Sequence, residues 1–152
     1  MNEIAQNTVL ISGGAGSMGQ LVSDYINSRD DFTLTAIHDP NYKGEEYKIY
    51  NDLKNIEEDT VLEFSPASVI NENIDSLLNS DADLIIGSSG VSSEMLSKLK
   101  LITDRKVIVI PNFSIGAAYQ KLFSIALSDT FNSVNITEKH HGKKQDAPSG
   151  TA

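Results

Sequence analysis

The segment at residues 138–151 holds the densest set of reactive side chains in this 152-residue chain. It reads Glu-Lys-His-His-Gly-Lys-Lys-Gln-Asp-Ala-Pro-Ser-Gly-Thr, with two adjacent imidazoles and two adjacent ammonium groups. An imidazole can accept or donate a proton near neutral pH, and a lysine can hold or protonate an anion. A Ser-Gly-Thr turn that opens a helix offers backbone N–H groups and hydroxyls to a carboxylate or phosphate. We therefore expect this segment to hold an anionic small molecule and to move protons on it.

A glycine-rich turn near the other end of the chain points to a second ligand. Residues 13–19 read Gly-Gly-Ala-Gly-Ser-Met-Gly, a close variant of the dinucleotide-binding fingerprint. An apolar, β-branched run at residues 8–12 precedes the turn, and an apolar stripe at helical spacing follows it. We therefore predict that a pyrophosphate docks where the turn opens this helix. The residues expected to contact the dinucleotide here are Gly13, Gly14, Ala15, Gly16, Ser17 and Met18.

Asp39 is the expected partner of the cofactor ribose. It lies about 20 residues beyond the last glycine and follows the second predicted strand, where a carboxylate binds ribose hydroxyls. A carboxylate repels a 2′-phosphate, and the nearest cations, Lys43 and Lys48, fall in a stretch whose structure the pattern does not define. NADH is therefore the predicted cofactor, with NADPH as the less favoured alternative. A turn residue before Pro40 is the structural alternative for Asp39.

The elements that must position these residues follow a strand–helix rhythm. Strands are predicted at residues 8–12, 32–38, 61–65, 84–87, 107–110 and 134–137, and helices at 18–26, 69–78, 95–99 and 115–129; residues 41–60 stay unassigned. This alternation indicates an α/β fold with a Rossmann-type, doubly wound parallel sheet, whose ligands bind at the carboxyl ends of the strands. We expect a dinucleotide-binding domain at residues 1–114. Residues 115–152 are expected to begin a second, α+β substrate domain that is incomplete in this chain.

Composition and charge exclude several classes of partner. The net charge of −9 argues against a nucleic acid and against an anionic membrane surface, because both require a basic face. The chain contains no cysteine, which excludes disulfides, thiolate metal sites and cysteine nucleophiles. No signal peptide is visible, and no apolar run approaches the roughly 20 residues that span a bilayer. We expect a cytoplasmic protein.

Together these motifs resemble the dihydrodipicolinate reductase (4-hydroxy-tetrahydrodipicolinate reductase) family of lysine biosynthesis, over nearly the whole chain. The residues that carry the resemblance lie at 13–19, 63–66 (Glu-Phe-Ser-Pro), 87–90 (Gly-Ser-Ser-Gly), 111–116 (Pro-Asn-Phe-Ser-Ile-Gly) and above all 138–152. The last segment is similar to the family signature Glu-x-His-His-x-x-Lys-x-Asp-x-Pro-Ser-Gly-Thr-Ala. The resemblance implies hydride transfer from a nicotinamide cofactor to a cyclic dicarboxylate, in diaminopimelate and lysine biosynthesis.

The resemblance also implies roles for single residues. His140 would act as the acid/base residue and Lys144 as the proton donor. The substrate carboxylate would be held by His141, Ser149, Gly150 and Thr151. The nicotinamide side would be lined by Gly87, Ser88, Ser89, Pro111, Asn112 and Phe113. Reducing a double bond conjugated to an imine requires a hydride on one carbon and a proton on its neighbour, which agrees with cationic groups in this segment.

Two departures from the family pattern stand out. Ser17 occupies a position where the family usually has arginine, so one cationic contact to the cofactor phosphates is missing, which weakens the case for NADPH. The family's substrate domain also continues well past Ala152 and then returns to the nucleotide domain. When full length, members of the family form homo-oligomers, so the resemblance implies a tetramer.

Plainer alternatives remain for several of these features. The His-His pair could cap a surface turn or bind a metal, although no further histidine, cysteine or acidic spacing supports a metal site. Lys143 is better explained as a solvated side chain, and Ser149 could serve as a helix N-cap. His38 fits a strand-end residue better than a catalyst. A truncated, non-catalytic dinucleotide-binding module, or a two-domain nicotinamide enzyme acting on an amino-acid semialdehyde, are the alternative functions.

Overall fold

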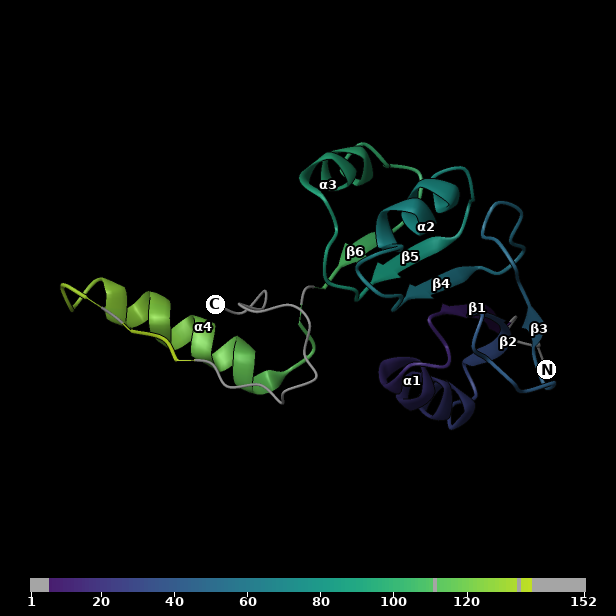
Figure 1. Cartoon of the computed structure of the whole chain (residues 1–152), viewed down its shortest axis with the longest axis horizontal. Coiled ribbons are helices and arrows are strands. Elements are labelled where there is room, and N and C mark those ends of the chain that lie inside the picture. The colour runs from purple at the N-terminus through teal and green to yellow at the C-terminus, as the bar shows by residue number, and fades with distance from the viewer. Residues whose placement is uncertain (1–5, 111, 134, 138–152) are drawn as a thin grey trace. The chain divides into compact units, whose positions relative to one another are not determined.

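The computed structural model describes residues 6–110, 112–133 and 135–137. These residues belong to two compact units, Met1–Ile110 and Pro111–Ala152, which we describe separately. In the first unit, six strands form one parallel sheet in the order β3-β2-β1-β4-β5-β6 (Figure 1). The strands are β1 (Asn7–Ser12), β2 (Phe32–His38), β3 (Lys48–Ile49), β4 (Thr60–Glu63), β5 (Asp83–Ile86) and β6 (Val107–Val109). This topology confirms the predicted Rossmann-type fold.

Helices cover both faces of this sheet, so its strands are apolar on both sides. Helix α1 (Ser17–Asn27) lies on one face, and α2 (Ile70–Leu77) and α3 (Ser93–Leu99) lie on the other (Figure 1). The side chains of β1 alternate between the two layers: Val9 and Ile11 join the cluster that contains Ile26 of α1, whereas Leu10 joins the cluster beneath α2 and α3. Each such buried side chain stabilises the fold by roughly 1.5–3 kcal/mol.

A bulge in β2 sets the register of the strand ends that form the site. The pairing of β1 with β2 shifts between Val9 and Leu10, so that Thr35 is the extra residue between Leu34 and Ala36. The Thr35 hydroxyl donates a hydrogen bond to the Val9 carbonyl oxygen at 3.3 Å. Beyond the bulge the register places Ser12 beside His38, at the carboxyl end of both strands.

Most of the elements predicted for the first unit are confirmed within a few residues at their ends. The short strand β3 was not predicted, because it lies in the polar stretch at residues 41–60 and both of its side chains are exposed. It pairs with β2 through Ala36 and Ile37. Strand β4 ends at Glu63, two residues before the predicted end.

The second unit contains α4 (Ile115–Ser128), which confirms the predicted helix. Its N-cap is Ser114, whose hydroxyl accepts a hydrogen bond from the Ala117 N–H at 3.3 Å. No α4 residue is buried. The predicted strand at residues 134–137 is wrong for residues 135–137, which form no strand, and Val134 lies outside the described residues. The domain boundary after residue 114 stays a prediction.

None of the helices in the described ranges is both long enough and apolar enough to cross a membrane.

Candidate functional site

The glycine turn between β1 and α1 is built so tightly that side chains would not fit. Gly13 adopts a positive φ of 81°, and its N–H donates to the His38 carbonyl oxygen at 2.8 Å. A Cβ atom at Gly13 would lie 2.7 Å from the Phe64 carbonyl carbon. At Gly19, in the first turn of α1, a Cβ atom would overlap the Gly13 carbonyl oxygen and lie 2.6 Å from the Gly14 Cα. Helix α1 therefore starts directly against the turn, as the fingerprint predicts.

The N-terminus of α1 is left open to a ligand. Its N-cap is Gly16, which has no side chain to accept a hydrogen bond, and its first turn contains no acidic residue. The first helical hydrogen bond runs from the Gln20 N–H to the Gly16 carbonyl oxygen, at 2.9 Å. The N–H groups of the first turn therefore have no partner within the helix, and the helix dipole makes this end positive. By contrast, α3 and α4 are capped by the hydroxyls of Ser92 and Ser114.

Asp39 lies beside this turn, as predicted. One carboxylate oxygen accepts the Ala15 N–H at 2.9 Å, and the other accepts the Asn41 N–H at 2.8 Å. These two bonds hold the half-buried carboxylate at the carboxyl end of β2, next to the glycine turn. Each oxygen keeps a further lone pair, so the carboxylate can also accept hydrogen bonds from a pair of ribose hydroxyls.

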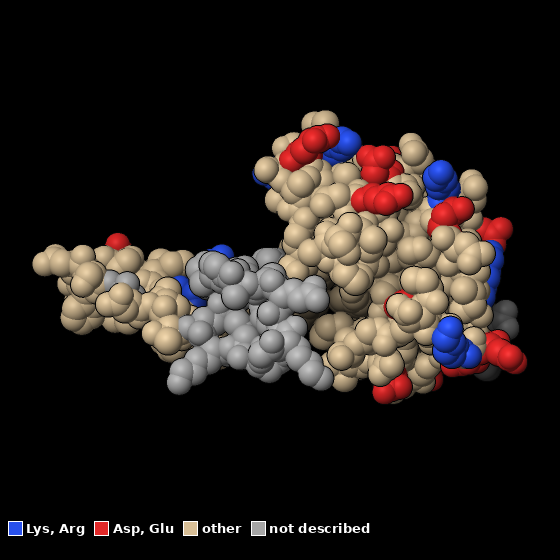
Figure 2. Space-filling model, viewed as in Figure 1, with Lys and Arg blue, Asp and Glu red and all other residues tan. Residues whose placement is uncertain are grey.

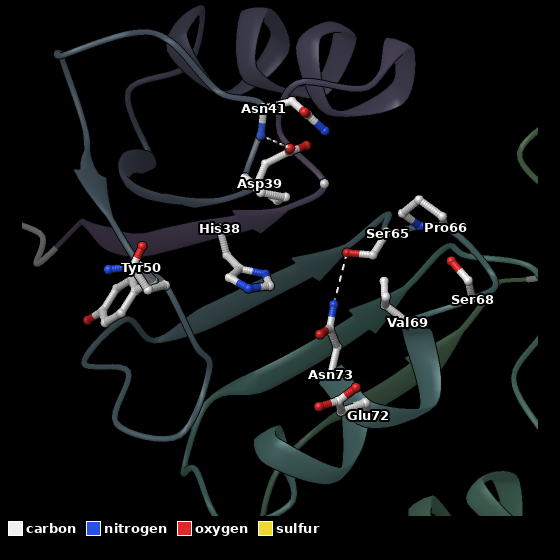
Figure 3. Close-up of a pocket in the computed structure, with 13 residues that line it drawn as sticks. His38, Asp39, Asn41, Tyr50, Ser65, Pro66, Ser68, Val69, Glu72 and Asn73 are labelled. Atoms are coloured by element: carbon white, nitrogen blue, oxygen red, sulfur yellow. Dashed lines mark hydrogen bonds between the residues drawn. The ribbon is translucent and has the colours of Figure 1, made fainter.

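A cavity of about 400 Å³ opens at this edge of the sheet, between the glycine turn and α2 (Figure 3). It is lined by Gly13, His38, Asp39, Pro40, Asn41, Tyr50, Asn51, Ser65, Pro66, Ser68, Val69, Glu72 and Asn73. The lining contains two carboxylates but no lysine or arginine. Lys48 is not a lining residue; it pairs with Glu57 at 2.7 Å, and its ammonium lies 4.5 Å from the centroid of the Tyr50 ring. On the visible face of the first unit most charged side chains lie toward the rim, and mainly uncharged residues occupy the middle (Figure 2).

A buried carboxylate organises the loop between β4 and α2. The side chain of Glu63 accepts the Ser65 backbone N–H at 2.6 Å and the Asn73 side-chain N–H at 3.3 Å, and Glu63 is only 1% exposed. Asn73 also donates to the Ser65 hydroxyl at 3.0 Å (Figure 3). A buried carboxylate is tolerated only when it is hydrogen-bonded, so these contacts fix the position of Ser65 and of the loop that follows it.

His38, at the end of β2, lies in this cavity between Tyr50 and Ser65 (Figure 3). Its Nδ1 atom is 2.9 Å from the hydroxyl of Ser12, a residue with no exposed surface. Burial lowers the pKa of His38 below its ordinary value, while the nearby carboxylates of Glu63, Asp39 and Asp52 act in the opposite direction. The lowered pKa favours the neutral form of the imidazole.

Comparison with known proteins places this geometry in a family. Residues 7–113 match the model of the N-terminal part of dihydrodipicolinate reductase. The chain belongs to the dihydrodipicolinate reductase family. It is 33% identical to the 4-hydroxy-tetrahydrodipicolinate reductase of Streptococcus uberis, over 95% of this chain and 60% of that protein. The enzyme of the same name from Streptococcus pneumoniae gives the same identity and coverage. The chain thus spans about 60% of the length of these relatives.

Solved structures agree with this assignment. The dipicolinate-bound dihydrodipicolinate reductase from Paenisporosarcina sp. TG-14 superposes with a TM-score of 0.72 at 28% identity, covering 96% of this chain and 62% of that one. A myo-inositol dehydrogenase from Lactobacillus casei, solved with NAD(H) and myo-inositol, gives a TM-score of 0.57 at 17% identity, covering 78% of this chain and 42% of that one. The second likeness concerns the fold alone. In this family the Rossmann-type domain binds a nicotinamide cofactor.

The structure brings together some of the predicted site residues of this reductase-family chain. Gly13 and Asp39 line the same cavity. The Ser88 hydroxyl donates to the Glu63 carbonyl oxygen at 3.2 Å and is buried, so it supports the strand ends, whereas Ser89 is exposed. Asn112 and Phe113 belong to the second unit, where the Asn112 side-chain oxygen accepts the Ser114 N–H at 2.7 Å.

Seven of the predicted site residues lie outside the described ranges. They are Pro111, His140, His141, Lys144, Ser149, Gly150 and Thr151. Among the described residues, no group of three or more histidine or acidic side chains is arranged to hold a metal ion.

Single sequence motifs do not predict the polar contacts along the wall of the cavity, which join Ser12, His38, Ser65 and Asn73. These residues are up to 61 positions apart in the sequence. The one available signal was Glu63, a carboxylate inside an otherwise apolar strand.

Proposed function

We propose that this protein is an NADH-preferring reductase of diaminopimelate and lysine biosynthesis. The substrate 4-hydroxy-tetrahydrodipicolinate loses its hydroxyl as water to give dihydrodipicolinate, which accepts a hydride from NADH and one proton to give tetrahydrodipicolinate. The observation that carries the proposal is the uncapped N-terminus of α1 beside the Asp39 carboxylate, in a chain of the dihydrodipicolinate reductase family. The curated relatives bear the name of this activity. The related structure from Paenisporosarcina is described with dipicolinate bound, which is a cyclic dicarboxylate, as is the proposed substrate.

The described residues offer contacts to the diphosphate and to the adenosine ribose of a dinucleotide. The N–H groups of the first turn of α1 would receive the diphosphate, and the closely packed glycines leave room for it to reach the backbone. The Asp39 carboxylate would accept hydrogen bonds from the ribose hydroxyls of the adenosine half. When bound, the nicotinamide supplies the hydride; the protein's part is to orient the ring and to exclude water around it.

The preference for NADH follows from the charges at the cavity. A 2′-phosphate would meet the carboxylates of Asp39 and Glu72 and no lining lysine or arginine. Ser17, exposed at the start of α1, supplies no positive charge. An uncompensated phosphate beside a carboxylate is unfavourable, so NADPH would bind more weakly than NADH.

Proton transfer and substrate binding are assigned to the segment at residues 138–151, on its likeness to the family signature. His140 would exchange a proton with the ring and Lys144 would donate the proton that completes the reduction. His141, Ser149, Gly150 and Thr151 would bind a substrate carboxylate. The nicotinamide would be flanked by Gly87, Ser88, Ser89, Pro111, Asn112 and Phe113. We further propose a cytoplasmic homo-oligomer, a tetramer by analogy with the family.

The assay that tests this function follows NADH oxidation by the purified protein with and without the cyclic dicarboxylate. NADH should be consumed only when the substrate is present. His140→Ala and Lys144→Ala should each lower kcat by about 10²- to 10⁴-fold, the usual contribution of a general acid or base, while NADH binding changes less than about 3-fold.

Lys143→Ala is the matched control, because it removes an adjacent ammonium group with no assigned role. It should retain kcat within about 3-fold of the unmodified protein. Loss of NADH binding and turnover in equal measure at His140 and Lys144 would contradict their roles. NADH that binds but is never oxidised would favour the non-catalytic dinucleotide-binding module.

A further inference from the structure

A chain of hydrogen bonds runs beneath the candidate cofactor cavity and ends on the imidazole of His38. The Asn73 side-chain N–H donates to the Ser65 hydroxyl at 3.0 Å. The Ser65 and Ser12 hydroxyl oxygens lie 3.0 Å apart, and the Ser12 hydroxyl lies 2.9 Å from His38 Nδ1. Ser12 has no exposed surface, so its hydroxyl proton must find a partner within the protein, whereas Ser65 is 7% exposed and lines the cavity.

We call this chain of hydrogen bonds from Asn73 through Ser65 and Ser12 to His38 the relay. The orientation of the Asn73 amide sets the direction in which its hydrogen bonds are donated. The Asn73 side-chain N–H donates to a Glu63 carboxyl oxygen at 3.3 Å. The opposite orientation of the amide would place its carbonyl oxygen against that oxygen in place of the N–H donor. Asn73 must therefore present its NH₂ group to both Glu63 and Ser65.

The two serines then transmit this direction to the imidazole. Ser65 accepts from Asn73 and has one hydroxyl proton, which the geometry directs to Ser12. Ser12 in turn has one proton, which goes to His38 Nδ1. In the reverse direction Ser65 would have to point its proton into the cavity that it lines instead of toward Ser12. Since Nδ1 accepts, the neutral imidazole carries its proton on Nε2.

We propose that His38 donates this Nε2–H to an acceptor atom on the base of the cofactor's adenosine half, and thereby contributes to the affinity for the cofactor. The inference rests on the proposed function of the cavity. Ribose hydroxyls are donors and are matched by the Asp39 carboxylate, whereas the ring nitrogens of a purine are acceptors and need an N–H. His38 shares the cavity with Pro40, Pro66 and Val69, which offer apolar surfaces to a planar base.

The tautomer can be tested without any cofactor. In ¹⁵N-histidine-labelled protein, long-range ¹H–¹⁵N spectra distinguish a protonated from an unprotonated ring nitrogen, and His38→Gln assigns the signal among the three histidines. His38 should appear as a neutral ring with its proton on Nε2. Asn73→Ala should shift the ring toward a mixture of tautomers, because it removes the donor that orients both serines. A proton found mainly on Nδ1 would overturn the inference.

Binding measurements then test the contact with the base. In His38→Asn the shorter side chain keeps a hydrogen-bond partner for Ser12 but cannot reach the base. In His38→Gln an amide N–H lies close to the position of Nε2. NADH should bind the Asn variant about 3- to 10-fold more weakly than the unmodified protein, as expected for loss of one hydrogen bond, and the Gln variant within about 2-fold. Reduced nicotinamide mononucleotide, which lacks the adenosine half, should bind all three proteins equally.

The outcomes separate this inference from the proposed function. If NADH binds the unmodified protein and the Asn variant equally well, the contact does not exist while the proposed cofactor site stands. If the Asn variant loses affinity for the mononucleotide as well, the effect of His38 is structural and the inference fails. If NADH does not bind the unmodified protein, both proposals fail, and the tautomer still reports on the relay alone.

Discussion

The first unit and α4 differ in how far their apolar side chains are buried. In the first unit the sheet and its helices enclose two clusters, and side chains such as Leu10, Ile74 and Leu84 are at most 1% exposed. In α4 no residue is buried, and Leu122 and Phe123 are at least 60% exposed. Both regions show helical or strand periodicity in the sequence. The periodicity predicts which face is apolar, and only the tertiary structure decides whether that face is covered.

This difference separates two sources of stability. Helix α4 has a serine N-cap and good helix-forming residues, but local propensity alone leaves a helix of this length marginal in water. The first unit gains the free energy of burying its side chains, so it can keep strained positions such as Gly13 and an unusual buried carboxylate such as Glu63. The candidate cofactor site is built from those costly features, and therefore depends on the core beneath it.

The largest effect should come from adding one methyl group at the turn. Gly19→Ala places a Cβ against the Gly13 carbonyl oxygen and the Gly14 Cα, which are backbone atoms that cannot move aside. We expect a loss of about 3 kcal/mol or more in the free energy of unfolding, measured in urea. Gly116→Ala in α4 is the control, because the nearest atom there, the Ser114 Oγ, would be 3.5 Å away. It should raise helix stability by up to about 1 kcal/mol. Equal destabilisation by both substitutions would remove the contrast between the regions.

A smaller contrast is expected from truncating one leucine in each region. Leu84→Ala, at 1% exposure in β5, should lower the free energy of unfolding by about 2–5 kcal/mol, because it leaves a cavity in the core. Leu122→Ala, at 60% exposure in α4, should change it by less than about 1 kcal/mol. Denaturant unfolding of both variants checks this. A loss at Leu122 as large as that at Leu84 would mean that α4 is packed as tightly as the sheet.

The smallest effect should be a pH dependence centred on His38. Burial lowers the pKa of His38 in the folded state, so just below the ordinary histidine pKa of about 6.5 the unfolded chain binds a proton that the folded chain does not. Stability should therefore fall as the pH drops from 7 through this range, and His38→Gln should remove that part of the fall. Thermal unfolding at several pH values measures it. Identical profiles for the two proteins would show that His38 does not titrate differently on folding.

The sequence predicted those features of the site that arise within one strand–turn–helix–strand unit. The glycine spacing and the strand on each side placed Asp39 at the turn, and the Ala15 N–H to Asp39 bond agrees with that expectation. The strand β3 escaped prediction because two exposed residues, Lys48 and Ile49, form no apolar pattern. The bulge at Thr35 and the relay to His38 also escaped it, since both depend on pairing between strands that are distant in sequence. The roles of the residues at 138–151 stay predictions.

Parallel titrations of NADH and NADPH test most directly whether the glycine turn and Asp39 form a dinucleotide site. The comparison uses the unmodified protein and Asp39→Asn, which keeps the shape of the side chain and removes its charge. NADH should bind the unmodified protein more tightly than NADPH, and Asp39→Asn should weaken NADH binding about 10-fold while leaving NADPH binding equal or stronger. An unmodified protein that binds neither cofactor, or a ratio of the two affinities that the substitution leaves unchanged, would contradict this site.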